Sequence, residues 1–353
     1  MTTYPSPTPR VKSHPFLRDD PLVVVERGGY PASVHRGVLA VADPDGTLTF
    51  SVGDPAQRAF LRSAAKPFQV MPAILSGGVD RFGLTPRELA VLCASHNAEE
   101  RHREAILSIL DRIGLPESAL ACGAHSPLHA PSAEALIRAG KKPTNVCNNC
   151  SGAHTGMLLA CIAMGWPTDS YGNPDHPLQV MTRSILGAFA GVESDSIEMA
   201  TDNCSVPTFR LPVLNTARAF ARLASGANLE RKLASAAARV REAMTAHPEM
   251  VAGEGRFDTA LMQAAQGTIV AKGGADGFQG VGVIDRGLGL ALKISDGGSR
   301  AVAPAVVPVL RYMEALSPED VMQLRQYAEP DDLDCNGTVV GRIRSLLVPD
   351  TRA

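Results

Sequence analysis

The apolar residues of this chain follow two different periodicities. Short β-branched runs, bounded by glycine, proline or aspartate, occur near both ends of the chain and predict strands. These runs cover residues 21–26, 37–42, 47–52, 268–270, 280–284 and 288–294. The sequence Asp-Pro-Asp-Gly at 43–46 separates the second run from the third and predicts a hairpin there.

Between these two groups of strands the apolar residues recur at helical spacing. Thr85 and Glu88 form a capping box around Pro86, which predicts the start of a helix. Further helices are predicted over residues 99–113, 132–140, 154–164, 177–189, 213–224 and 229–246. A last helix, over 304–316, precedes a polar tail.

The order strands, helices, strands predicts an α+β fold, in which a mostly antiparallel sheet is built from both chain ends and carries a helical lobe. We expect residues 1–20 to form a flexible lead-in and residues 21–353 to form a single unit. The sheet lobe should comprise about 21–60 and 265–345, and the helical lobe about 61–264. A catalytic cleft is expected between the two lobes.

Composition narrows the class of protein. The 353 residues are 45% hydrophobic and 20% charged, which is typical of a globular domain, and the net charge of −2 argues against a nucleic-acid-binding surface. No apolar stretch near the N-terminus resembles a signal peptide, and residues 301–310 are too short, with two prolines, to span a membrane. We therefore expect a cytoplasmic protein with neither nucleic-acid nor membrane partners. The seven cysteines show no disulfide framework.

Ser63 and Lys66 form the only Ser-x-x-Lys in a chain with seven lysines. Positions i and i+3 of a helix share a face, so the lysine amine can reach the serine oxygen and act as the base that a serine nucleophile needs. Pro67 is best tolerated near a helix start, which predicts that the helix begins around Ser63. A capping serine beside a solvent-exposed lysine would show the same spacing.

Two further segments follow in chain order. They are Ser95-His96-Asn97 and Lys272-Gly273-Gly274. With Ser63 and Lys66 they resemble the triplet of penicillin-binding and class A β-lactamase enzymes, in which two hydroxyl–amine pairs relay protons around one acyl centre. Gly273 lacks the hydroxyl group usual in the third element.

A cysteine-rich turn carries a second kind of chemistry. Cys147 and Cys150 form half of a structural zinc motif, and His154 follows four residues later. Cys204, with Asp202 near it, could add a further thiolate and a carboxylate. Buried cysteines near a helix start are the plain alternative.

Taken together, these segments resemble the L-asparaginase II family of the Rhizobium etli inducible type. The matching stretches are residues 27–29 with Ser33 and His35, 62–67, 93–96, 147–152, 175–177, 201–204, 247–253 and 272–276. The resemblance implies a serine-β-lactamase-like fold, a homodimer, and hydrolysis of L-asparagine to L-aspartate and ammonia.

The resemblance also implies roles for individual residues. Ser63 would be the nucleophile with Lys66 as its base, and Ser95 with Lys272 would be the second Ser-Lys pair. Arg62, His154 and Asp202 would line the substrate pocket, and Cys150 and Cys204 would be zinc ligands. Family members commonly have a third zinc ligand, a lysine, where this chain has Ala153. Alanine cannot serve as a zinc ligand, so His154 or water would have to take the third ligand position. The Ser-Lys chemistry itself does not require the metal.

Three other interpretations remain open from the sequence. One is metal-assisted amide hydrolysis at Cys150 and Cys204, with Ser63 structural. Another is a catalytically impaired homologue that binds an amino acid. The third, by fold analogy alone, is β-lactam hydrolysis. The preference for asparagine over glutamine depends on about one methylene of pocket depth, which no motif reveals.

Overall fold

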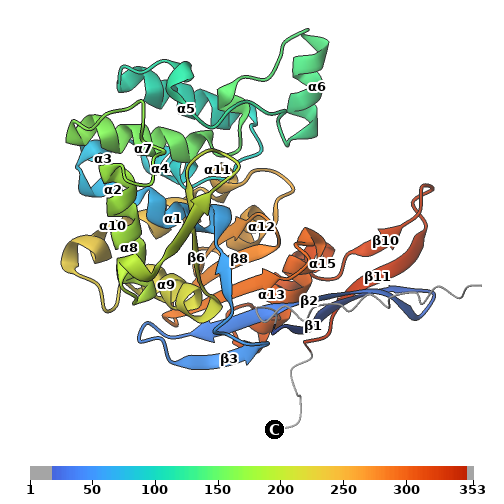
Figure 1. Cartoon of the computed structure of the whole chain (residues 1–353). Helices are drawn as coiled ribbons and strands as arrows, with labels where there is room; N and C mark the ends of the chain where they lie inside the picture. Colours follow the sequence, from blue (N-terminus) through green and yellow to red (C-terminus); the bar gives the residue numbers. More distant parts are fainter. Residues whose placement is uncertain (1–17, 348–353) are drawn as a thin grey trace, which may run out of the picture.

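An antiparallel sheet of eight strands organises the protein. The computed structural model describes residues 18–347, and the sheet has the order β10-β11-β1-β2-β9-β8-β7, with β3 beside β2. Its strands are β1 Asp20–Arg27, β2 Tyr30–Ala42, β3 Leu48–Val52, β7 Ile269–Gly274, β8 Phe278–Val283, β9 Leu288–Ile294, β10 Asp331–Leu333 and β11 Val339–Ser345. Figure 1 shows the blue and red ends of the chain side by side in this sheet. The predicted α+β fold with a sheet built from both chain ends is confirmed.

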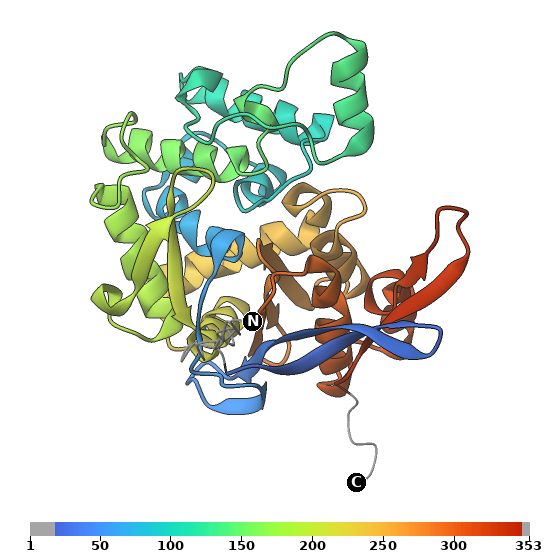
Figure 2. The same cartoon turned by 45° about the vertical axis from the view of Figure 1, so that its right-hand side comes forward.

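The register of the strands explains how the chain ends meet. Strand β1 pairs with β2 on one side and with β11 on the other, where Val25 lies opposite Ile343. Strand β2 pairs in turn with β9, where Leu39 lies opposite Leu292. The hairpins β1–β2 and β10–β11 project together from the body of the molecule, as Figures 1 and 2 both show.

Helices cover the sheet. Every residue of β8 is buried, which requires cover on both faces of that strand. Helix α9 (Val213–Ser225) packs against β2, β8 and β9, and α13 (Val302–Tyr312) against β1, β9 and β11. Gly280 permits the close approach of α9, because a Cβ atom there would lie 2.0 Å from the Phe220 ring.

The remaining helices form the lobe above the sheet in Figure 1. They are α1 Lys66–Gln69, α2 Met71–Leu75, α3 Gly78–Arg81, α4 Pro86–Leu92, α5 Glu100–Arg112, α6 Ala130–Arg138, α7 Ser151–Met164, α8 Pro177–Ala190, α10 Arg231–Ala246, α11 Pro248–Val251 and α12 Phe257–Ala264. The capping box predicted at Thr85 is present at the start of α4. Across the described residues, no helix is both long and apolar enough to cross a bilayer.

Two parts of the fold differ from the sequence prediction. A small sheet joins β4 (Arg58–Phe60), β6 (Pro207–Pro212) and β5 (Glu198–Thr201), and β5 and β6 lie within the region expected to be helical. Residues 317–345 belong to the predicted sheet lobe, but no individual helix or strand is predicted in this polar segment, which forms α14 (Pro318–Gln323), α15 (Arg325–Ala328), β10 and β11. Only one position of these two strands, Ile343, is buried, so they lack the apolar alternation that identified the others. Residues 1–17 of the predicted lead-in lie outside the described residues.

Candidate active site

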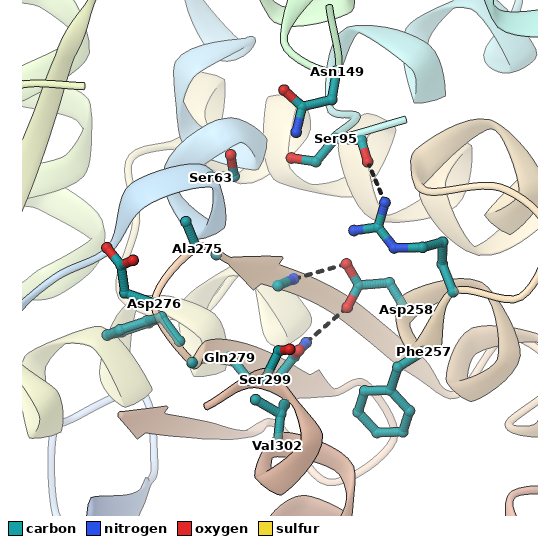
Figure 3. A pocket seen from close by; sticks show the side chains of 15 residues that line it. Ser63, Ser95, Asn149, Phe257, Asp258, Ala275, Asp276, Gln279, Ser299 and Val302 are labelled. Carbon is teal, nitrogen blue, oxygen red and sulfur yellow. Dashed lines mark hydrogen bonds between the residues drawn. The ribbon is translucent and has the colours of Figure 1, made fainter. Parts of the chain in front are cut away.

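A cavity of about 320 Å³ lies where the helical lobe meets the end of β7. The view in Figure 3 places Ser63, Ser95 and Asn149 on one side of it and Asp258, Gln279 and Ser299 on the other. Ser63 and Ser95, which lie 32 positions apart in the sequence, thus share one cavity wall. This location agrees with the cleft expected between sheet and helices.

The backbone around Ser63 is unusual. Ser63 lies in a 3-10 turn, η1 (Arg62–Ala65), which leads into α1, so a helical segment does begin at the predicted place. Arg62 has a φ of +51°, a left-handed conformation that costs a non-glycine residue of order 1 kcal/mol or more. The N–H of Arg62 donates to Thr208 Oγ1 and that of Ala64 to the Leu61 carbonyl. Among residues 18–347 the Ser63 N–H has no partner, and the turn leaves it available to an oxyanion.

The Arg62 side chain fixes this strained residue. Its Nε donates to Asp202 Oδ1 at 2.8 Å and its Nη2 to Asn203 Oδ1 at 2.6 Å, while Nη1 pairs with Asp276. Arg62 and Asp202 are both largely buried, with side chains 17% and 14% exposed. The guanidinium therefore ties the turn that carries Ser63 to two separate loops.

Lys66 is the centre of the polar contacts. Its Nζ donates to Ser95 Oγ at 2.9 Å, to the Ala94 carbonyl at 2.8 Å and to Cys150 Sγ at 3.2 Å, and the side chain is buried. The Ser63 hydroxyl, by contrast, makes no hydrogen bond to a described residue, including Lys66. The structure thus brings Lys66 to Ser95 and leaves the Ser63 hydroxyl directed to the cavity without a partner.

Lys272 has different partners from those that the resemblance implies. Its buried Nζ donates to the Gly273 carbonyl at 2.7 Å and lies 3.6 Å from Asp258 Oδ2, and the described residues include no hydrogen bond between Lys272 and Ser95. Burial lowers the pKa of Lys272 to about 8, and the nearby Asp258 charge opposes this shift. Asp258 also accepts hydrogen bonds from the Gly273 N–H and the Gln279 side chain. The pair therefore holds the ends of β7 and β8 against α12.

Cys150 and Cys204 are close to each other and buried. The hydrogen bond from Cys204, together with the Lys66 ammonium, lowers the pKa of the Cys150 thiol to about 5, and the same contact raises the pKa of Cys204. Cys150 immediately precedes α7, a position that favours a thiolate. The Cys150 sulfur thus has Lys66 and Cys204 as neighbours, and both contacts favour its ionised form.

The resemblance implies a bound zinc ion, but the structure supplies too few protein ligands for one. Among residues 18–347, no group of three or more histidine, cysteine, aspartate or glutamate side chains is arranged to hold a metal ion. Structural zinc sites take four protein ligands and catalytic sites three, whereas Cys150 and Cys204 supply two. Ala153, on α7, contributes none. The residues present do not fit a zinc ion, and no step below passes through one.

His154 belongs to the interior of the helical lobe. Its Nδ1 lies 2.6 Å from the Tyr171 hydroxyl, and its buried Nε2 has no hydrogen-bond partner in the described residues. Burial lowers the pKa of His154 to about 3, so the ring is neutral near pH 7. The cavity wall includes none of the three residues expected to line the substrate pocket, Arg62, His154 and Asp202. Arg62 nevertheless precedes Ser63 and bonds Asp202, so these two residues act on the site from behind the wall.

Several residues that line the cavity were not predicted from the sequence. Arg256, Asp258 and Gln279 line it, and none stands in a spacing that predicts chemistry. Arg256 and Asp258 follow directly after the stretch 247–253 that was part of the family resemblance. Their position next to that stretch was the available signal.

The sheet, the helical lobe and the serines and lysines gathered where they meet define an α+β protein with a hydrolase-like site. The chain belongs to the L-asparaginase II family, because the model of that family, described as L-asparaginase II, matches residues 23–345.

Comparison with solved structures gives more distant similarities. A structure described as Mglu in its native form is 16% identical with a TM-score of 0.46; the match covers 79% of this chain and 64%, less than two thirds, of that one. A β-lactamase from Mycobacterium bovis is 14% identical with a TM-score of 0.41, over 83% of this chain and 95% of that one. A β-lactamase described as putative, from Bacteroides dorei, is 14% identical with a TM-score of 0.40, over 78% of this chain and 93% of that one. No curated protein matches the chain.

Proposed function

We propose that this protein hydrolyses L-asparagine to L-aspartate and ammonia through an acyl-enzyme on Ser63. The observation that carries the proposal is the contact of Lys66 Nζ with Ser95 Oγ, at 2.9 Å, beside a cavity that also receives the unpartnered Ser63 hydroxyl. Within a family of amide-hydrolysing enzymes, this arrangement supplies a nucleophile and a proton carrier on one wall.

In the proposed first half-reaction, Lys66 as the free amine takes the Ser63 proton, directly or through Ser95. The Ser63 oxygen forms a bond to the side-chain amide carbon, and the Ser63 N–H stabilises the oxyanion. The carbon–nitrogen bond then breaks. Ser95 passes a proton to the leaving nitrogen and is reprotonated by Lys66, with which it shares a hydrogen bond. Ammonia leaves, and Ser63 carries an aspartyl ester.

In the second half-reaction a water molecule attacks the ester carbon and gives a proton to Lys66, now again a free amine. The bond to the Ser63 oxygen breaks, that oxygen takes the proton back, and aspartate leaves. Lys272 has no proton-transfer step in this scheme, because its contacts are to Asp258 and Gly273. Its proposed role is to hold the strand end that closes the cavity. The protein is further proposed to form a homodimer, as the family resemblance implies, and to act in the cytoplasm.

The test is ammonia release from L-asparagine, with L-glutamine alongside, by the wild type, Ser63→Ala and Ser299→Ala. Ser299 lines the same cavity but has no step in the mechanism, so its variant is the matched control. We expect Ser63→Ala to lose at least about 10³-fold in kcat and the control to stay within a few-fold. An asparagine analogue with a diazoketone in place of the amide should label the wild type at Ser63, as located by peptide mass spectrometry. Turnover by Ser63→Ala near the wild-type rate would refute the assignment.

A further inference from the structure

The charges on the cavity wall do not balance. Three charged side chains line it: Arg256, Asp258 and Asp276. Asp258 is paired with Lys272, and Asp276 with Arg62, which also pairs with Asp202. No aspartate or glutamate within the described residues lies within 4 Å of the Arg256 guanidinium. Among the described residues, Arg256 is therefore the one charged side chain of the cavity wall without an ion-pair partner.

The contacts of Arg256 hold it in place and leave part of it free. Its Nη1 donates to Asn97 Oδ1 at 2.9 Å and to the Ser95 carbonyl at 3.3 Å, and both acceptors are neutral. Its Nε and Nη2 have no partner in the part of the chain that the structure describes. Arg256 directly precedes α12, so the backbone that carries it is also anchored. A positioned guanidinium with free N–H groups is suited to bind a carboxylate.

We infer that Arg256 binds the α-carboxylate of the amino-acid substrate and thereby selects amides that carry a carboxylate over amides that lack one. This inference rests on the proposed function and adds a specificity-determining residue to it. Because Arg256 also bonds the Ser95 carbonyl, the bound carboxylate lies next to the segment that carries the Ser95 hydroxyl. The side-chain amide of the substrate is then directed away from Arg256, toward Ser63 on the same cavity wall.

The experiment compares two amides in the wild type, Arg256→Lys and Arg256→Gln. The amides are L-asparagine and 3-aminopropanamide, which is asparagine without its α-carboxylate. We expect Arg256→Gln to lower kcat/KM for asparagine by about 100-fold, mostly through KM, since the variant removes a charge-assisted hydrogen bond to the α-carboxylate. Turnover of 3-aminopropanamide should change by less than about threefold, and Arg256→Lys should recover part of the loss. An equal loss for both amides would mean that Arg256 only supports the Ser95 segment, and would overturn the inference.

A binding measurement separates this inference from the proposed function. L-Aspartate should raise the melting temperature of the wild type more than β-alanine, which lacks the α-carboxylate, and Arg256→Gln should remove that difference. The control is Arg286→Gln, whose arginine pairs with Glu314 at the surface. If the wild type binds aspartate but releases no ammonia, the proposed function fails while Arg256 is still tested. Equal stabilisation of the wild type and Arg256→Gln by aspartate would overturn the role of Arg256 whatever the turnover.

Discussion

Lys66 Nζ donates a hydrogen bond to Cys150 Sγ at 3.2 Å, on the sulfur pair at which the resemblance implies a zinc ion. Cys204 makes a second contact with Cys150, and this contact lowers the pKa of the Cys150 thiol. Side chains of the chain itself thus surround the sulfur atoms. This matters because Ala153 occupies the position at which the family commonly has a lysine ligand.

The first prediction concerns metal content. We expect the wild type, purified with zinc supplied, to contain well below one zinc per chain by elemental mass spectrometry. Ala153→Lys should approach one zinc per chain, because it adds a third donor to the two thiols. Adding Cys204→Ala to that variant should return the zinc content to the wild-type level. Stoichiometric zinc in the wild type would contradict this prediction.

The second prediction concerns the chemistry of Lys66. Lys66→Arg keeps the positive charge and the capacity to donate to Ser95, but arginine does not give up its proton near neutral pH. We expect kcat to fall by at least about 10³-fold, within the range attributed to general acid–base catalysis. Because Lys66 is buried, a substitution there could unfold the protein, so a circular-dichroism melting curve is recorded for Lys66→Arg and, as a control without the charge, for Lys66→Met. An active, folded Lys66→Arg enzyme would exclude lysine as the base.

The third prediction tests the contact between Arg62 and Asp202. Asp202→Asn should lower kcat/KM by about 10- to 100-fold, because the charge-assisted bond at 2.8 Å helps to hold the strained residue before Ser63. Arg62→Ala should cost at least as much, since Arg62 also bonds Asn203 and Asp276. The double variant should be no worse than Arg62→Ala alone. Additive losses would show that the two residues act separately.

The fourth prediction concerns stability and pH. Lys272 titrates near pH 8 in the folded protein and near 10.5 as an unperturbed side chain, so between these values the unfolded chain binds more protons. The free energy of unfolding of the wild type, relative to Lys272→Met, should therefore rise with pH, by about 2 kcal/mol between pH 7.5 and 9.5. Urea unfolding of both proteins at the two pH values measures this difference. A difference that stays constant or falls over this range would be incompatible with a buried lysine of lowered pKa.

The sequence predicted the parts of the fold that local patterns encode. The capping box at Thr85 and the β-branched runs near both ends are local signals, and α4 and the central strands appear where they were expected. Strand β5 is short and mostly exposed, so its pairing with β6 depends on contacts that no local pattern records. The hairpin β10–β11 was missed for the same reason.

The candidate site was predicted less completely. The lone Ser-x-x-Lys indicated Ser63 and Lys66, but the partner of Lys66 was not predictable from spacing, because Ser95 lies 29 positions away. Lys272 was assigned to Ser95 by analogy, whereas its contact is Asp258, which comes from a helix earlier in the chain. Arg256 was indicated only by its position close to the stretch 247–253, because its significance comes from the absence of a facing acid in three dimensions.

The pairing of β1 with β11 has a consequence for how the protein acquires activity during synthesis. Glu26 and Arg344, which bond across these strands, are 318 positions apart, so β1 gains its outer neighbour only after β11 has been synthesised. The two sides of the cavity are also made at different times, because Ser63 is synthesised much earlier than the β7 segment that faces it. A growing chain therefore carries Ser63 without an assembled pocket until β7 has joined it, and the proposed hydrolysis cannot begin before then.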